Sequence, residues 1–208
     1  MGHEKSLGNF PHEHTADVDL DDQHPSPHQT RHHPRHTEAI RATQGDALIY
    51  LEELTQQYQL PRKLVFAVAD AESSVNPGIS PQPNVYKDRK GQTHRSTDYG
   101  LMQINDKTWL GKSVKDANGH SFKITDHVKD DWRANAQAGV AILKHAYDLA
   151  ALSEGPGASR EDIAIATYSM YNHGQGRWHR FLEKRRDGLP KDDANRNFAV
   201  KYKQWPEK

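Results

Sequence analysis

Glu72 is the residue whose type and position best suit acid–base chemistry. It follows Leu64 and Val68 at four-residue intervals in a predicted helix, so its carboxyl extends an apolar stripe. Loss of hydration in such surroundings disfavours the charged carboxylate and raises its pKa. A Glu that stays protonated near neutral pH can donate a proton to a leaving oxygen. Position alone also allows a helix-end Glu that faces water, so the neighbouring segments decide between the two interpretations.

Three short segments, in a fixed order, give this carboxyl its context. They are Glu72-Ser73, then Gly100-Leu101-Met102-Gln103-Ile104, then Tyr171-Asn172-His173-Gly174. A Glu-Ser pair alone is common, but the three together are specific. The set resembles the lysozyme-like superfamily and, within it, the SLT-type lytic transglycosylases, particularly the small secretion-associated ones. The resemblance covers about residues 46–205.

This resemblance implies cleavage of the β-1,4 bond between N-acetylmuramic acid and N-acetylglucosamine in peptidoglycan. Glu72 would protonate the bridging oxygen. In the lytic transglycosylase route, the same carboxylate then removes a proton from the muramic 6-hydroxyl, which closes a 1,6-anhydro ring without water. The implied partner is the glycan strand, and neither a cofactor nor a metal ion is expected.

The resemblance also assigns a set of substrate-binding residues around Glu72. They are Ser73, Gly100, Met102, Gln103, Tyr168, Tyr171 and Asn172. Met102 and Gln103 would line the sugar cleft, and Tyr171 would hydrogen-bond near the catalytic carboxyl. Asn172 would brace a turn or contact the substrate, and Ser73 would support the helix end or bind the sugar.

Plainer interpretations exist for several of these positions. Met102 and Tyr168 could equally be core residues. Gly100 and Gly174 are most simply positions where the backbone needs room. The three tryptophans Trp109, Trp132 and Trp178 could stack on sugar faces, although large aromatic residues are more often part of a core.

Asp98 opens an alternative mechanism. The segment Ser96-Thr97-Asp98-Tyr99-Gly100 resembles c-type lysozymes, whose second carboxylate stands at that Asp. If Asp98 faces Glu72 across a cleft, a hydrolytic, retaining muramidase follows, and a carboxyl separation of ~5–5.5 Å favours that route. The plain alternative is an Asp that caps a turn before Tyr99. Two further alternatives are a non-catalytic peptidoglycan-binding module and a His-rich metal-binding protein.

Hydrophobic periodicity predicts a mainly α domain over residues 46–208, and the resemblance implies that this domain has the α+β lysozyme-like fold. Helices are expected at about 46–60, 62–73, 106–112, 130–152, 159–174 and 192–205. Pro61 suits a helix start, and Ser159 suits an N-cap with Asp162 three residues later. The Pro-, Gly- and Asn-rich stretch at about 75–99 predicts turns or a small β-ribbon.

Residues 1–45 form a His- and Pro-rich tail that is predicted to be disordered, because it holds too few apolar side chains to offset backbone ordering. Eight of the 14 His residues lie within the first 36 positions. Three interpretations remain open for the tail: a solvated linker, a segment read by an export partner, and a Zn²⁺ or Ni²⁺ site built from residues such as His12, His14 and His32.

Charge and composition exclude several classes of protein. Lys and Arg total 28, as do Asp and Glu, so a strongly basic nucleic-acid binder is not predicted. There is no Cys, and no apolar run is long enough to span a membrane. The basic cluster formed by Arg177, Arg180, Lys184, Arg185 and Arg186 is interpreted as a solvated helix face or as a contact for anionic wall polymers.

Localisation follows from the implied substrate, which lies in the periplasm or outside the cell. The first residues lack the basic start and apolar stretch of a secretory signal peptide. Delivery by a specialised secretion system or a phage particle is therefore the expectation, which makes the protein a secreted, bacteriolytic effector. Its candidate protein partners are a secretion apparatus and an immunity protein.

Overall fold

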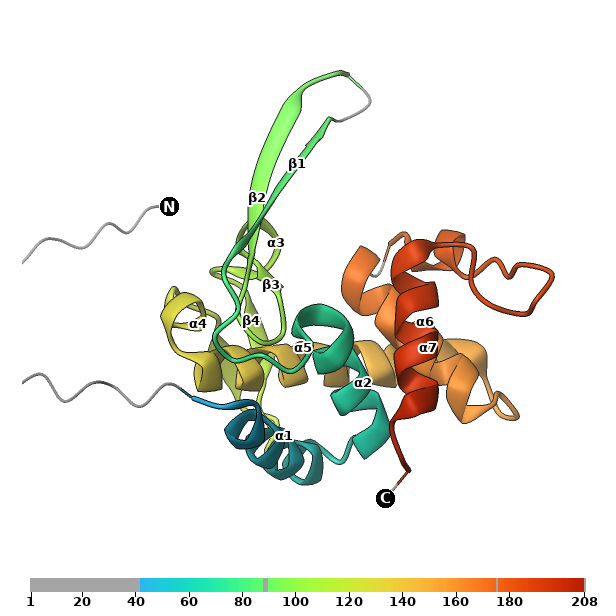
Figure 1. The fold of residues 1–208 in the computed structure, drawn as a ribbon, viewed down its shortest axis with the longest axis horizontal. Helices are drawn as coiled ribbons and strands as arrows, with labels where there is room; N and C mark the ends of the chain where they lie inside the picture. Colours follow the sequence, from blue (N-terminus) through green and yellow to red (C-terminus); the bar gives the residue numbers. More distant parts are fainter. Residues whose placement is uncertain (1–41, 88–89, 175, 208) are drawn as a thin grey trace, which may run out of the picture. The chain divides into compact units, whose positions relative to one another are not determined.

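The computed structural model describes residues 42–87, 90–174 and 176–207, which form seven α-helices, one 3-10 helix and five short strands (Figure 1). The helices are α1 (Gln44–Tyr58), α2 (Arg62–Ser73), α3 (Asp106–Trp109), α4 (His127–Asp130), α5 (Trp132–Glu154), α6 (Arg160–His173), η1 (Trp178–Phe181, 3-10) and α7 (Asp193–Gln204). The strands are β1 (Gln82–Lys87), β2 (Thr93–Tyr99), β3 (Ile104–Asn105), β4 (Ser113–Lys115) and β5 (Ser121–Lys123). The mainly helical α+β fold class with a small β-ribbon is thus confirmed. The predicted disordered tail lies outside the described residues as far as residue 41.

Polar side chains cap the starts of α1 and α6, whereas α2 and α4 begin without a side-chain cap. α2 occupies the predicted range, and Pro61 is its N-cap residue. The Ser159 side chain accepts from the Asp162 backbone N–H at the start of α6, as predicted. α1 begins two residues earlier than the predicted Asp46, because Thr43 and Asp46 form a reciprocal capping box.

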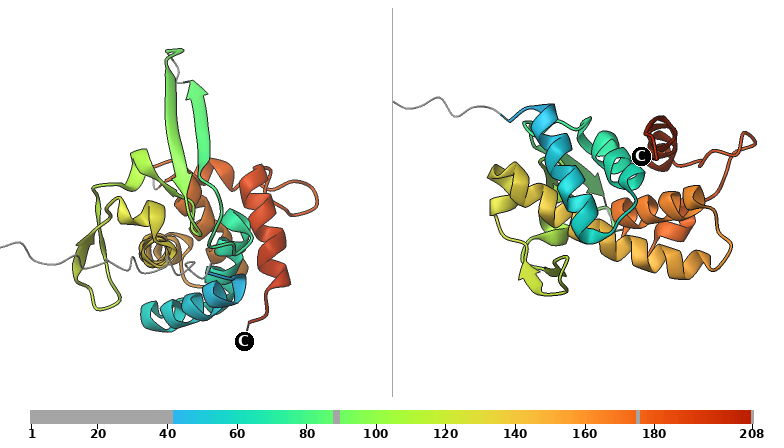
Figure 2. Two further views of the ribbon diagram at one scale, coloured as in Figure 1. Left: turned by 60° about the vertical axis from the view of Figure 1, so that its left-hand side comes forward. Right: turned by 90° about the horizontal axis from the view of Figure 1, so that it is seen from below.

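Helix α5 is the centre of the fold and contacts α1, α4, α6 and β4 (Figure 2). Its buried face consists mostly of Ala, Gly and Val residues, which allow close approach of the neighbouring elements. The closest approach is at Gly139, where an added Cβ would lie 2.3 Å from the Cβ of Met102. The loop after β2 is therefore pressed directly onto α5.

Helix α7 packs against α2 and α6. Two of its contacts reach Asp70, which lies two positions before Glu72. The Lys201 ammonium lies 2.8 Å from one Asp70 carboxylate oxygen, and the Trp205 indole N–H donates to the other at 3.1 Å. Trp205 also stacks edge-on against Phe66 of α2, with ring centroids 5.1 Å apart. The last part of α2 is thus held on its outer side.

The β1–β2 hairpin projects away from the helices (Figures 1 and 2). Its strands are antiparallel, from the pair Gln82 and Asp98 at the base to Lys87 and Thr93 near the turn. The two-residue strand β3 pairs with the base of β2. The β-ribbon predicted within 75–99 is therefore confirmed, and it places Asp98 beside Asn105.

Five short elements (β3, α4, β4, β5 and η1) were not predicted, and one prediction was too long. α4 and the β4–β5 hairpin contain three or four residues per element. The helix expected at 106–112 ends at Trp109, because Leu110 is extended and Gly111 has φ 80°. The Gly111 N–H then donates to the Ile124 carbonyl and begins the β4–β5 hairpin. Within the described residues, no helix is both long and apolar enough to cross a membrane.

Candidate active site

The end of α2 fixes the position of Glu72. Ser74 and Val75 both adopt left-handed backbone conformations, with φ of 54° and 55°. A positive φ is uncommon for any residue with a side chain and is strained for a β-branched one such as Val75. Ser73 is buried; its hydroxyl donates to the Ala69 carbonyl and accepts from the Asn76 N–H. Of its two predicted roles, Ser73 therefore supports the helix end.

The surroundings of Glu72 favour the protonated form of its carboxyl at neutral pH. Burial is the main cause, and it raises the pKa of Glu72 from an ordinary value of 4.5 to about 8. The negative charge of Asp98 raises this pKa further, whereas a hydrogen bond from the Tyr168 hydroxyl lowers it. At neutral pH most Glu72 side chains are therefore neutral acids that can give up a proton.

Tyr168 and Tyr171 flank this carboxyl from α6, but they make different contacts. Tyr168 is buried and stacks on Phe198, with centroids 4.4 Å apart, and its hydroxyl accepts from the Asn172 amide at 3.3 Å. The Tyr171 hydroxyl donates instead to the Met102 carbonyl at 2.6 Å. Burial raises the pKa of both phenols, so both remain hydrogen-bond donors. The hydrogen bond to Glu72 therefore comes from Tyr168, not from Tyr171.

The loop between β2 and β3 is shaped by the buried side chain of Asn135. That amide accepts from the Met102 N–H at 2.8 Å and donates to the carbonyls of Tyr99 and Val128. Gly100 has φ 68°, and an added Cβ would lie 2.6 Å from the Asn135 amide. Gly100 is thus needed for room, as predicted, and it lies behind the groove and not on its surface.

The side chains of Met102 and Gln103 point in opposite directions at this loop, Met102 into the core and Gln103 into the groove. Met102 is fully buried against α5, so the prediction that it lines the sugar cleft is wrong. The tight turn points it inward and leaves the next residue outward. Gln103 has φ 45°, and its side-chain amide donates to the Gly100 carbonyl at 2.9 Å. A left-handed Gln is uncommon and indicates a position where side-chain placement is worth some backbone strain.

Asp98 lies on β2 in the same groove as Glu72. Its two carboxylate oxygens accept from the side-chain amides of Asn84, at 2.6 Å, and Asn105, at 2.7 Å. It is paired within the sheet with Gln82 and Asn105. The interpretation of Asp98 as a turn cap is therefore wrong.

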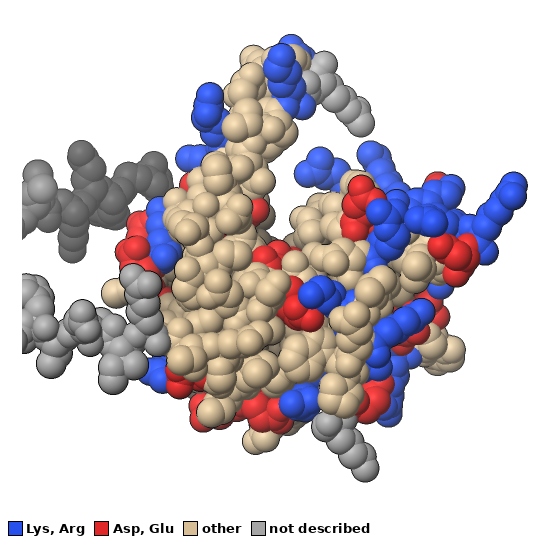
Figure 3. All heavy atoms as spheres, in the orientation of Figure 1, with Lys and Arg blue, Asp and Glu red and all other residues tan. Residues whose placement is uncertain are grey.

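A groove of about 550 Å³ connects these residues, in the size range of small-ligand sites. Of the predicted site residues, its lining includes Glu72, Asp98, Gln103, Tyr171 and Asn172. Ser73, Gly100, Met102 and Tyr168 are not among its lining residues. In Figure 3 the surface is hollowed between the β1–β2 hairpin and the lobe to its right, where Lys and Arg side chains gather.

Several lining residues were not predicted. They include Asn84, Val85, Tyr86, Ser96, Asn105 and His173. His173 stood in the quoted motif, and it contacts the Asp192 carboxylate at 3.2 Å. The register of the hairpin brings Asn84 opposite Ser96, which stands in the lysozyme-like segment quoted above. No signal in the sequence marks the others.

The basic cluster and the tryptophans take mixed positions. The basic cluster lies on η1 and the segments beside it, so the interpretation of this cluster as a helix face is wrong. Of its members, Arg177 lines the groove and the others do not. Lys184 and Arg185 are paired with Asp162 and Asp187. Trp109 lines the groove, whereas Trp178 is buried and Trp132 stacks on Tyr50. In the described ranges, no group of three or more His, Asp or Glu residues could hold a metal ion.

Comparison with known families identifies the chain. A family described as the transglycosylase SLT domain matches residues 49–193, a range that includes α2, the β1–β2 hairpin and α6. The chain therefore belongs to the SLT transglycosylase family of the lysozyme-like superfamily. Searches of curated proteins and of solved structures gave no match.

Proposed function

We propose that Glu72 is the catalytic acid and then the catalytic base in the non-hydrolytic cleavage of peptidoglycan. Membership of the SLT family assigns peptidoglycan lytic transglycosylase activity in general terms. The residue-level mechanism is our proposal. The observation that carries it is a carboxyl in the groove whose pKa is raised to about 8.

The proposed reaction has two proton transfers and consumes no water. Glu72 gives its proton to the oxygen that bridges C1 of N-acetylmuramic acid and C4 of N-acetylglucosamine, and the C1–O bond breaks. The muramic O6 then bonds to C1 while its proton passes to the Glu72 carboxylate. One group thus acts as acid and base and ends in its starting state, which suits a pKa near the working pH.

The other residues divide into sugar contacts and positioning residues. We propose Gln103, Tyr171 and Asn172 as sugar contacts, because they line the groove around Glu72. Tyr168 positions the carboxyl through its hydrogen bond. Ser73, Gly100 and Met102, which the resemblance associated with substrate, act only on the shape of the site.

Digestion of purified sacculi tests this proposal. We expect wild-type protein to release muropeptides whose muramic end is one water lighter than a reducing end, as measured by mass spectrometry. Glu72→Gln keeps the size of the side chain and its ability to accept from Tyr168, but it cannot donate the required proton. We expect release to fall by at least about 10³-fold.

Glu53→Gln is the matched control, because Glu53 is an exposed residue of α1 outside the groove. It should digest sacculi at the wild-type rate. Undiminished release by Glu72→Gln would refute the acid role. Binding to sacculi by wild-type protein without any release would support instead a non-catalytic binding module.

A hydrolytic muramidase is the second candidate, and the position of Asp98 favours it. Asp98 lines the same groove and its charge acts on Glu72. In that mechanism Asp98 would act as the nucleophile or would stabilise the cation, and water would complete the reaction. Products with hydrated reducing ends, together with full dependence on Asp98, would select it over the lytic route.

Proteins of this family act on peptidoglycan in the periplasm or outside the cell. We propose that residues 46–208 are the catalytic domain and that the His- and Pro-rich segment before them is used in delivery to rival cells by a secretion apparatus. Deleting residues 1–41, which leaves the Thr43 cap of α1 in place, should stop export and leave digestion of sacculi unchanged. Continued export would refute the role of this segment. Protection of the target cell by a co-expressed inhibitor would identify an immunity protein.

A further inference from the structure

A second pocket adjoins the candidate active groove. It has a volume of about 720 Å³ and lies between the β4–β5 hairpin and helices α5 and α6. The two cavities share four lining residues: Thr108, Trp109, Tyr171 and Gly174. The two cavities therefore adjoin at Trp109 and Tyr171.

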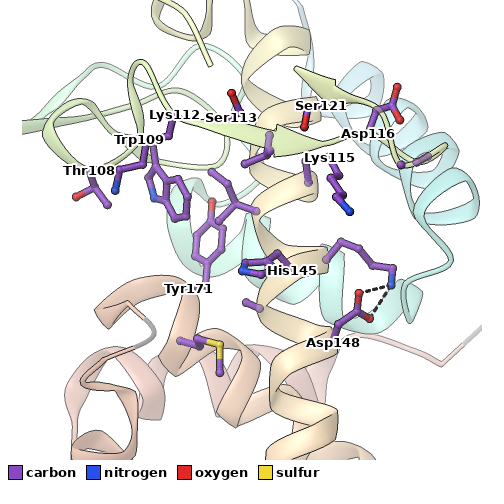
Figure 4. A pocket seen from close by; sticks show the side chains of 18 of the residues that line it. Thr108, Trp109, Lys112, Ser113, Lys115, Asp116, Ser121, His145, Asp148 and Tyr171 are labelled. Atoms are coloured by element: carbon purple, nitrogen blue, oxygen red, sulfur yellow. Dashed lines mark hydrogen bonds and ion pairs between the residues drawn. The ribbon is translucent and has the colours of Figure 1, made fainter. Parts of the chain in front are cut away.

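Figure 4 shows how the pocket is arranged. Trp109 and Tyr171 lie at one end, Lys115 and Asp148 lie at the other, and His145 lies between them. Lys115 points from the hairpin into the cavity. The Lys112 ammonium lies 5.4 Å from the centre of the Trp109 ring, so it stands at the end nearer the groove.

The charges of the pocket are unequally paired. Asp148 is neutralised by Lys144, whose ammonium lies 2.6 and 2.7 Å from its two oxygens. The Asp116 carboxylate accepts from the backbone N–H groups of Asn118 and His120. Within the described ranges, neither Lys112 nor Lys115 pairs with a carboxylate. Two exposed cations, one toward each end, are therefore available to a ligand.

We propose that this pocket binds the stem peptide of the glycan strand that lies in the groove. The proposal rests on the function proposed above. Each N-acetylmuramic acid carries a short peptide on its lactyl group, and free carboxylates are spaced along that peptide. Such a ligand matches the pocket in continuity with the groove, in its apolar lining at Trp109 and in the two cations. The protein would thus prefer strands that still carry their peptides.

Two substrates test this preference: glycan strands with intact stem peptides, and the same strands after an amidase has removed the peptides. We expect wild-type kcat/KM to be about tenfold higher on the first. In the double variant K112Q/K115Q the ratio of the two values should approach one, with the loss mainly in KM, because exposed charge pairs contribute modestly to binding.

The matched control is K107Q/K203Q, which removes the same charge from exposed lysines that line neither cavity. It should keep the wild-type ratio. Equal wild-type activity on the two substrates, or an unchanged ratio in K112Q/K115Q, would overturn the proposal. Failure of the proposed function appears separately, as activity that survives Glu72→Gln on both substrates.

Direct binding provides a test without catalysis. The Glu72→Gln protein is titrated with the free stem tetrapeptide and with the same peptide amidated at its carboxylates. We expect amide chemical-shift changes within residues 112–121 for the first peptide and at least about tenfold weaker binding for the second. Equal affinity for the two peptides, or changes confined to other regions, would contradict a carboxylate-binding pocket.

Discussion

The two walls of the groove present the same chemical group in opposite surroundings. On the helical wall, Glu72 is the second-last residue of α2 and lies beside Tyr168 and Tyr171, and burial raises its pKa to about 8. On the sheet wall, Asp98 meets two side-chain amides, from Asn84 and Asn105. The first environment removes most hydration from the carboxyl and supplies one hydrogen bond, from Tyr168, whereas the second supplies a donor to each oxygen.

What a carboxyl group can do in this groove therefore depends on its environment more than on its residue type. A carboxyl that is held neutral can donate a proton, and a carboxylate fixed by amides can only accept or attract. The donors to Asp98 come from the two strands that pair with β2: Asn84 lies on β1 and Asn105 on β3. The hydrogen bond to Glu72 of α2 instead comes from Tyr168 of α6, which is distant in the sequence.

Neutralising each carboxyl in turn tests whether the two walls of the groove have different roles. Glu72→Gln should lower kcat/KM on sacculi by at least about 10³-fold, whereas Asp98→Asn should lower it by about tenfold or less. The reason is that only Glu72 transfers protons in the lytic route. Asp126→Asn, at an exposed residue outside the groove, is the control. Equal large losses for both groove variants would mean that the walls act as one catalytic pair.

Stability should depend on pH through Glu72. Between its ordinary pKa of 4.5 and the raised value of about 8, the folded protein binds more protons than the unfolded chain. The contribution of Glu72 to the free energy of unfolding is therefore fully present below pH 4.5 and is lost as the pH rises toward 8. Gln does not titrate, so Glu72→Gln should be more stable than wild type at pH 9, by on the order of 2–4 kcal/mol.

Denaturant unfolding at pH 9 and at pH 4 measures this effect. The two proteins should have nearly equal free energies of unfolding at pH 4, where Glu72 is protonated in both the folded and unfolded states. A wild-type protein that is the more stable one at pH 9 would show that Glu72 is solvated in the fold.

Two conservative changes should move the pH profile in opposite directions. Tyr168→Phe removes a hydrogen bond that favours the charged carboxylate, so the alkaline limb of kcat/KM should shift to higher pH. Asp98→Asn removes a repelling charge, so the limb should shift to lower pH. We expect Tyr168→Phe to lower kcat by about tenfold. Shifts of the same sign would contradict the assignment of these two contacts.

Regular elements and their caps were predictable from local sequence. The apolar spacing of Leu64 and Val68 located α2 and gave Glu72 its place on the stripe. The position of Ser159 before Asp162 located the start of α6. These signals depend only on residues within one or two turns, which is why they can be found without knowledge of the rest of the chain.

Contacts between distant elements were not predictable in the same way. Tyr168 and Tyr171 stand three positions apart on α6, and only the loop held by Asn135 decides which hydroxyl meets the Met102 carbonyl. The resemblance assigns Met102 to the groove, but Gly139 has no side chain and leaves space on α5 that the Met102 side chain fills. Strands of two or three residues are too short for any periodic signal.

The brace between α7 and α2 has a consequence for the acid. Lys201 and Trp205 grip Asp70 one half-turn before Glu72, although no described residue of α7 lines the groove. Proteolytic removal of the chain from Lys201 onward would leave every residue that lines the groove in place. It would nevertheless remove both contacts to Asp70 and so weaken the support of the helix end that carries Glu72. Truncation at the C-terminal end would then lower activity without removing any residue of the groove.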